Sequence, residues 1–176
     1  RAEIDPRFEL SEQPLVSVLI PTYNRPHYLE LALKSVLNQT YRPIEIIICD
    51  DSTNDETEKM IQPYLNRYNQ IRYYKNERNL SVENFYKCLE LARGDYVNYL
   101  MDDDLFHEEK IEKMLQFFIR NPDVVLVTSH RDFIDGSGNV LPDQNPKWFE
   151  RTQTMDGRQL GSLMLEIGCN LIGEPT

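Results

Sequence analysis

The chain has 176 residues, of which 40% are hydrophobic and 27% are charged, and its formal net charge is −10. This length and composition are typical of one soluble globular domain with a single core. No apolar run approaches the roughly 20 residues that a membrane-spanning helix needs. The acidic balance argues against binding to nucleic acid, and it disfavours an anionic substrate unless a cation lies between substrate and protein.

The beginning of the chain and its cysteines say something about context. The first residues contain neither an initiator methionine nor a signal-like apolar segment, so we expect a piece of a longer protein. Cys49, Cys88 and Cys169 are widely spaced and odd in number. That pattern favours free thiols in a reducing compartment over a disulfide framework or a metal cluster.

Short apolar runs that indicate strands alternate with segments whose apolar residues recur at helical spacing. The predicted strands cover residues 15–20, 44–49, 71–75, 96–101 and 123–129. The predicted helices cover residues 27–39, 61–68, 82–92, 111–118 and 156–168. Gly94 is expected to close the third helix in a left-handed conformation, and the sequence DGSGN at 135–139 predicts a hairpin turn.

Alternating strands and helices predict an α/β fold with a mainly parallel sheet and right-handed crossovers. In such sheets ligands bind at the carboxyl ends of the strands. The candidate functional segments are therefore the turns Pro21–Arg25, Asp50–Asn54 and Asp102–Asp104. We expect the strands that precede them to be neighbours, so that the three turns open on one edge of the sheet.

Two of these turns also have ordinary structural explanations. The side chains of Asp50, Asp51 and Ser52 are common helix caps, and a helix is predicted to follow them. The segment Pro21–Asn24 is also compatible with a plain connection between a strand and a helix.

The run Asp102–Asp104 is harder to explain in this way. A helix cap needs one acceptor, whereas three adjacent carboxylates repel one another. A bound Mg²⁺ or Mn²⁺ would relieve that repulsion, because both ions take carboxylate oxygens and share their remaining positions with phosphate. His107 lies nearby, but no second histidine has ligand spacing, which argues against zinc.

Two long segments carry a resemblance to a known family. VSVLIPTYNRPHYLELALKSVLNQTYRPIEIIICDDSTNDET and ARGDYVNYLMDDDLFHEEKIEKM resemble the corresponding parts of family 2 glycosyltransferases, and the likeness covers about residues 14–129. The resemblance implies a GT-A type fold, a Rossmann-like, mainly parallel sheet flanked by helices, in a single truncated domain over 1–176. It also implies sugar transfer from a nucleotide diphosphate-sugar, a UDP-sugar by preference, with inversion and with Mg²⁺ or Mn²⁺.

The resemblance assigns the nucleotide to the first two turns. Pro21, Thr22, Tyr23 and Asn24 match the first nucleotide-contacting loop, in which Tyr23 stacks on or flanks the base while Pro21 and Thr22 offer backbone contacts. Asp51 matches the acidic residue that accepts a hydrogen bond from the imide of uracil. A carboxylate suits an N–H donor at that place and rejects a carbonyl.

The resemblance assigns the ribose of the nucleotide and the metal to the third turn. Asp102 and Asp104 match the Asp-x-Asp motif, whose first member meets the ribose and whose last member binds the metal. Both are metal candidates, and Asp103 competes for either role because the register of the run is ambiguous. Arg78 lies in a loop from which some members direct a side chain to the base or phosphate. The sequence of this loop at residues 79–81 is Asn-Leu-Ser, where the family frequently has Asn-x-Gly.

The catalytic base stays unassigned, because the resemblance places it beyond Thr176. The acceptor is a glycan, a lipid-linked glycan or a protein, in a setting such as bacterial polysaccharide biosynthesis. We expect the protein in the cytoplasm or at the cytoplasmic face of a membrane. Two alternatives stay open: a noncatalytic module that binds nucleotide-sugar, and a nucleotidyltransferase, although PTYNRP lacks the glycines of a phosphate-binding loop.

Overall fold

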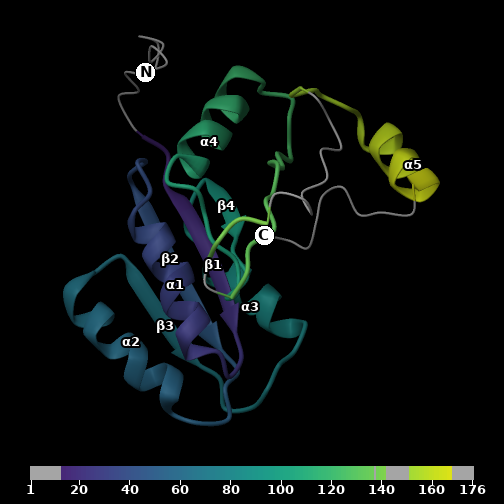
Figure 1. The fold of residues 1–176 in the computed structure, drawn as a ribbon. Coiled ribbons are helices and arrows are strands. Elements are labelled where there is room, and N and C mark those ends of the chain that lie inside the picture. The colour runs from purple at the N-terminus through teal and green to yellow at the C-terminus, as the bar shows by residue number, and fades with distance from the viewer. Residues whose placement is uncertain (1–12, 137, 142–150, 168–176) are drawn as a thin grey trace. The chain divides into compact units, whose positions relative to one another are not determined.

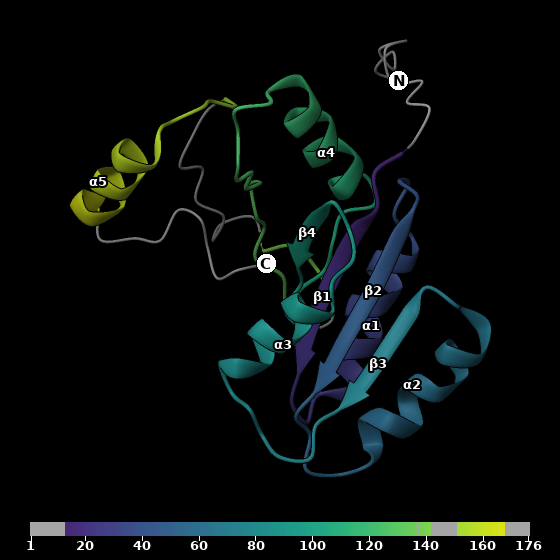
Figure 2. The same cartoon turned by 180° about the vertical axis from the view of Figure 1, so that it is seen from behind.

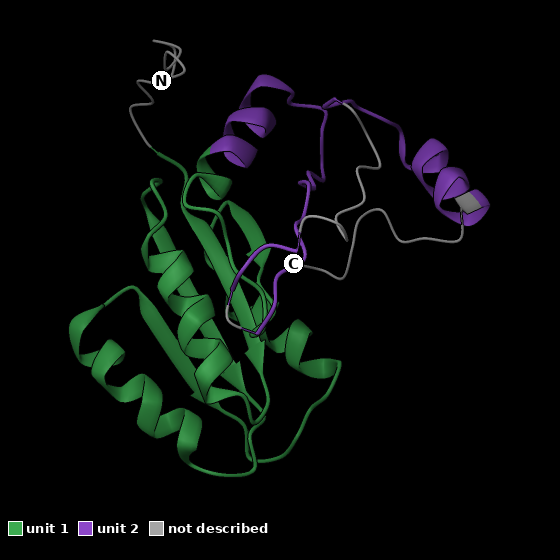
Figure 3. Cartoon of the chain, viewed as in Figure 1, with its two compact units in different colours: residues 1–112, 175–176 green, residues 113–174 purple. Residues whose placement is uncertain are grey.

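A computed structural model of the chain describes residues 13–136, 138–141 and 151–167. The chain divides into two compact units, residues 1–112 with 175–176 and residues 113–174 (Figure 3). The prediction of a single domain over 1–176 stays a prediction. All three candidate turns belong to the first unit.

The first unit is built on a four-stranded parallel sheet with the strand order β3-β2-β1-β4 (Figure 1). The strands are β1 (Val16–Thr22), β2 (Ile44–Asp50), β3 (Ile71–Lys75) and β4 (Tyr96–Tyr99). In the register, Thr22 lies beside Asp50 and Leu19 lies beside Tyr99. The predicted parallel α/β sheet is therefore confirmed, and so is the expectation that the first, second and fourth strands are neighbours.

Helices cover both faces of this sheet, α1 and α2 on one side and α3 on the other (Figures 1 and 2). The helices are α1 (Pro26–Leu37), α2 (Glu56–Arg67), α3 (Glu83–Leu91), α4 (Lys110–Arg120) and α5 (Gly157–Ile167). Because both faces are covered, every residue of β1 and β2 is buried. That burial explains why these two strands are continuous apolar runs rather than alternating ones.

The core lies between the sheet and these helices. On one face, α1 buries the four apolar residues Leu29, Ala32, Leu33 and Val36. On the other face, Cys88 of α3 packs with Cys49, Leu19 and Ile47. Cys49 and Cys88 are buried free thiols, as predicted, and Cys169 lies outside the described residues.

Two predictions about local structure are wrong. Residues 123–129 form neither strand nor helix, and Val125 is 93% exposed. An apolar run favours a strand, but its packing context decides whether one forms. Gly94 does not adopt a left-handed conformation, since Gly138 is the described glycine with a positive φ, at 83°. A Cβ atom on Gly94 would instead lie 2.7 Å from the carbonyl oxygen of Leu15 and the amide nitrogen of Ser17. The glycine is thus required for close approach to β1.

The second unit contains most of α4, the predicted turn near Gly138 and α5. An antiparallel bridge between Ile134 and Val140 closes the turn, which confirms the hairpin around 135–139 as far as the structure describes it. None of the helices in the described part of the chain is long and apolar enough to cross a membrane.

Candidate functional site

The three candidate turns converge at the carboxyl edge of the sheet. The amide of Asp51 donates to the carbonyl oxygen of Thr22 at 2.9 Å, and the amide of Asn24 donates to Ser52 Oγ at 2.8 Å. The hydroxyl of Thr22 donates to Asp102 Oδ2 at 2.7 Å. The first turn therefore contacts both of the others, as the parallel order of β2, β1 and β4 predicts.

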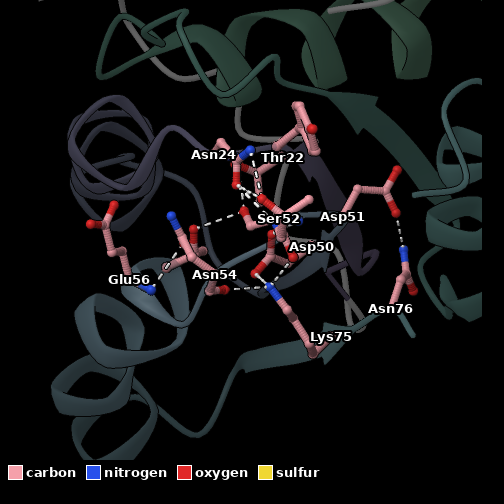
Figure 4. A network of polar contacts seen from close by, with 12 residues as sticks. Thr22, Asn24, Asp50, Asp51, Ser52, Asn54, Glu56, Lys75 and Asn76 are labelled. Atoms are coloured by element: carbon pink, nitrogen blue, oxygen red, sulfur yellow. Dashed lines mark hydrogen bonds and ion pairs between the residues drawn. The ribbon is translucent and has the colours of Figure 1, made fainter. Parts of the chain in front are cut away.

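Asn24 fastens the first turn to the second (Figure 4). Its φ of 54° lies in the left-handed region, which asparagine tolerates better than most side chains. Its Oδ1 accepts the amide of Thr53 at 3.0 Å, and its Nδ2 donates to Thr53 Oγ1 at 3.2 Å. The side chain of Asn24 is thus engaged within the protein, and it stabilises the loop that carries Tyr23.

Asp50 is a buried structural anchor rather than a surface ligand. Its Oδ2 accepts from the hydroxyl of Tyr73 at 2.6 Å and from Lys75 Nζ at 3.0 Å. Its Oδ1 accepts the amide of Ser52 at 2.7 Å. Burial of Tyr73, together with this carboxylate, raises the pKa of the phenol. Lys75 also donates to the carbonyl oxygen of Asn54, so that β3 secures the second turn along its length (Figure 4).

The helix-cap explanation of the second turn is not what the structure contains. α2 begins after Asp55, and the amide of Glu56 donates to Asn54 Oδ1 at 3.2 Å. Asp50 is bonded to β3, and Ser52 Oγ contacts the first turn and the hydroxyl of Thr57 in α2 rather than a backbone amide of the helix. The N-cap residue of α2 is Asp55, whose side chain makes no capping hydrogen bond, so the role of Asp51 has to be explained separately.

Asp51 holds the loop 76–81 against the edge of the sheet. Its carboxylate is 4% exposed, and its Oδ1 accepts from Asn76 Nδ2 at 2.6 Å (Figure 4). Its Oδ2 accepts the backbone amides of Leu80 and Ser81 at 3.0 and 3.1 Å. Ser81 has a φ of 54°, so this serine adopts the left-handed conformation that a glycine would adopt more easily.

Two other predicted contact residues are exposed. The side chain of Arg78 is 78% exposed, and it forms a long ion pair of 3.9 Å with Glu83. The structure therefore does not bring Arg78 to the carboxylates of the site. Tyr23 is 45% exposed, while its amide lies 3.4 Å from Asp102 Oδ2. Tyr23 is therefore accessible from solvent at this edge of the sheet, and its contact with a base stays a prediction.

The three aspartates of the third turn have different surroundings. Asp102 is 4% exposed, and its pKa is raised by burial, an effect that the hydrogen bond from Thr22 and the charge of Arg25 oppose. Asp103 accepts from Arg25 Nη1 at 2.6 Å. Asp104 is exposed, and its amide donates to the carbonyl oxygen of Met101. Because α4 begins at Lys110, well beyond Asp104, capping of that helix does not explain the cluster.

The segment after the aspartates is fixed to the end of α1 by residues that sequence reasoning missed. The amide of Phe106 donates to Ser35 Oγ at 3.0 Å. Gln39 Nε2 donates to the carbonyl oxygen of His107 at 2.8 Å, and Gln39 Oε1 accepts the amide of Ile111 at 3.0 Å. The available signal was a polar residue at the end of an amphipathic helix, which is too common to single out Gln39.

The donor set of the third turn fits a hard divalent cation. Carboxylate oxygens are the ligands that Mg²⁺ and Mn²⁺ prefer, and Asp103 and Asp104 are exposed. Within the part of the chain that the structure describes, no group of three or more His, Cys, Asp or Glu side chains is placed to hold a metal. An ion held by one or two carboxylates would need substrate phosphates and water as its further ligands.

Comparisons with solved structures concern the fold. A mannosyltransferase from Pyrobaculum calidifontis, solved with GDP-Man and Mn²⁺, has a TM-score of 0.59 at 20% identity, over 69% of this chain and 38% of that chain. TarS of S. aureus, solved with UDP, has a TM-score of 0.55 at 21% identity, over 68% of this chain and 41% of that chain. The expected GT-A type fold is confirmed by these similarities.

The sequence comparisons establish the family. An uncharacterised glycosyltransferase of Methanocaldococcus jannaschii is 35% identical over 142 residues, which are 79% of this chain and 49% of that protein. An uncharacterised glycosyltransferase of Haemophilus influenzae is 33% identical over 131 residues, 73% of this chain and 51% of that protein. The chain thus spans about half the length of these curated relatives. The model of glycosyl transferase family 2 matches residues 17–173, and the chain belongs to that family.

Proposed function

We propose that this chain binds a nucleotide diphosphate-sugar, by preference a UDP-sugar, together with Mg²⁺ or Mn²⁺, and that the protein transfers the sugar to an acceptor with inversion. The observation that carries the proposal is the hydrogen-bonded convergence of Thr22, Asp51 and Asp102 at one edge of the sheet. That edge is where parallel α/β sheets bind ligands.

We assign the contacts to the nucleobase to Tyr23 and Asp51. Tyr23 presents an accessible ring. Asp51 already accepts three hydrogen bonds, yet an ionised carboxylate has about four acceptor positions, which leaves room for one N–H of a base. Uracil and guanine both present a ring N–H, and the two structural neighbours were solved with UDP and with GDP-Man. We choose uracil because Asp51 matches the family's uracil-contacting position.

The diphosphate is assigned to the aspartate turn. Asp104, with Asp102 or Asp103, would hold the divalent cation, which supplies Lewis-acid stabilisation of the departing diphosphate when bound. Thr22 and Arg25 keep Asp102 in one orientation, which suits a carboxylate that receives a ribose hydroxyl. Ser35 and Gln39 restrain the segment that follows, and so limit the freedom of Asp104.

The transfer itself is a single in-line displacement at the anomeric carbon. The acceptor oxygen forms a bond to that carbon while the bond to the diphosphate breaks, and a base takes the proton of the acceptor hydroxyl. We assign no residue to this base. The acceptor is a glycan, a lipid-linked glycan or a protein. The buried free thiols Cys49 and Cys88 support a reducing compartment such as the cytoplasm.

Titration calorimetry with uridine, guanosine and adenosine diphosphates, each with and without Mn²⁺, tests the donor. We expect uridine diphosphate with Mn²⁺ to bind most tightly, with a dissociation constant in the range of about 1 μM to 1 mM. Asp51→Ala should weaken binding at least about tenfold, whereas Asp55→Ala, at an exposed position paired with Lys59, should not. Equal affinity of the protein and Asp51→Ala would remove Asp51 from the site, and preference for another base would overturn the choice of donor.

A further inference from the structure

Arg25 joins the first turn to the aspartate turn. It directly precedes α1, and its Nη1 lies 3.3 Å from Asp102 Oδ1 and 2.6 Å from Asp103 Oδ2. Its side chain is half exposed, and the attraction of Asp102, followed by that of Asp103, raises the pKa of its guanidinium. The side chain of Arg25 therefore pairs with Asp102 and Asp103, two of the three carboxylates that are assigned to the ribose and the metal.

This position has an electrostatic consequence for a metal ion. A divalent cation bound to Asp102 or Asp103 would lie within a few ångströms of a permanent positive charge. At such short separation like charges repel appreciably even beside solvent. The guanidinium also occupies oxygens that the cation would use. A cation that arrives alone must therefore displace Arg25 or bind beside it, and either course weakens its binding.

An anionic diphosphate changes this balance. Its negative charges attract both the divalent cation and the guanidinium, so their mutual repulsion is offset when all three are present. A guanidinium released from Asp103 is also well suited to phosphate oxygens, which it binds through paired hydrogen bonds. The half-exposed side chain has the freedom for this exchange.

We propose that Arg25 is an internal counterion of the aspartate turn, which competes with the divalent cation for Asp102 and Asp103 and makes metal binding depend on the donor diphosphate. This inference rests on the proposed function, since it concerns the same site. In thermodynamic terms, Arg25 creates positive coupling between metal and nucleotide: each binds more tightly in the presence of the other.

Electron paramagnetic resonance of free Mn²⁺ measures this coupling without any activity assay. In the absence of nucleotide, Arg25→Gln should bind Mn²⁺ about tenfold more tightly than the unaltered protein, because a neighbouring unit charge is gone. Arg25→Met, a second neutral variant, should behave alike, and Arg25→Lys should stay close to the unaltered protein. Lys59→Gln is the matched control, because it removes one charge from an exposed ion pair with Asp55.

Uridine diphosphate provides the second half of the experiment. It should tighten Mn²⁺ binding by a clearly larger factor in the unaltered protein than in Arg25→Gln. If neutral Arg25 variants bind Mn²⁺ no more tightly than Lys59→Gln, the counterion role is refuted, while nucleotide-dependent Mn²⁺ binding by the unaltered protein would keep the proposed function. Absence of Mn²⁺ binding in every variant, with and without nucleotide, would overturn both.

Discussion

Replacing Gly94 with alanine should damage both the fold and the site. The new Cβ would lie 2.7 Å from the carbonyl oxygen of Leu15 and from both the amide nitrogen and Oγ of Ser17. The first two are backbone atoms at the start of β1, which cannot rotate away as the end of a long side chain would. The contact therefore forces β4 and β1 apart near residue 94, where the amide of Gly94 donates to Ser17 Oγ at 2.8 Å.

The loss of stability in Gly94→Ala can be worked out from the contacts that the new methyl group disturbs. Overpacking of a dense interior costs roughly 1–3 kcal/mol, and each strained hydrogen bond adds about 1 kcal/mol. The bonds at risk are that of Gly94 and that from the amide of Asp95 to the carbonyl oxygen of Leu15 at 2.8 Å. The free energy of unfolding should thus fall by about 4 kcal/mol, which lowers Tm by about 12 °C in a protein of this size.

Urea and thermal unfolding measure this effect against a matched control. Gly161 lies inside α5, and a Cβ atom there would meet no atom within 4 Å. Gly161→Ala should therefore be neutral or should stabilise the protein by up to about 1 kcal/mol, as alanine does in helices. Since β4 leads to Asp102, Gly94→Ala should also weaken nucleotide binding. If the free energy of unfolding of Gly94→Ala lies within about 0.5 kcal/mol of that of the unaltered protein, the close-approach argument is wrong.

Three further changes follow from the site and its surroundings. Asp104→Asn should abolish the rise in Tm that Mn²⁺ with uridine diphosphate produces, which corresponds to about 2.7 kcal/mol of stabilisation at a hundredfold excess over the dissociation constant. Without ligand, Asp104→Asn should melt no lower than the unaltered protein. An undiminished rise in the Tm of this variant would move the metal to Asp103. Ser81→Gly should raise the free energy of unfolding by about 1 kcal/mol in urea, because φ is 54° at this serine; a loss of stability would mean that the serine side chain has a role of its own. Burial acts to raise the pKa of Glu45, but hydrogen bonds from Ser17 and the amide of Arg93, together with Arg72, leave that pKa lowered. The ionised carboxylate therefore stabilises the fold above the unfolded pKa, and this stabilisation is lost as pH falls through the folded pKa, so the stability difference between the protein and Glu45→Gln should shrink below about pH 4.5. A stability difference that does not change with pH would contradict this.

The sequence was sufficient to predict the sheet and the meeting of the three turns, since both follow from periodicity and from strand order. The apolar runs that became β1 and β2 have no other way to be buried, and parallel pairing places their following turns together. The run 123–129 is also rich in valine and leucine, yet it forms no strand. Composition therefore predicts the tendency to form a strand, whereas packing context decides whether one forms.

The contacts of individual side chains were harder to predict. Arg25 lies in a predicted candidate turn, but its ion pairs were not predicted, because Asp102 and Asp103 are far away in sequence and become its neighbours through the pairing of β1 with β4. Gly94 was misinterpreted because a glycine after a helix satisfies two requirements equally well, a left-handed cap or a close approach. Adjacent aspartates likewise look equivalent in sequence, yet Asp50 bonds to β3 and Asp51 bonds to the loop 76–81.

The way Asp51 holds the loop 76–81 makes that loop a convenient place for protein engineering. The carboxylate of Asp51 accepts hydrogen bonds from the backbone amides of Leu80 and Ser81 and from the side chain of Asn76. None of these hydrogen bonds involves the side chains of Glu77 and Arg78, which are exposed. Variation at these two positions should therefore leave the frame of the loop in place while it changes the charge on the exposed face of the loop. A library confined to residues 77 and 78 is thus a way to vary the surface of this loop without disturbing the hydrogen bonds that hold it to Asp51.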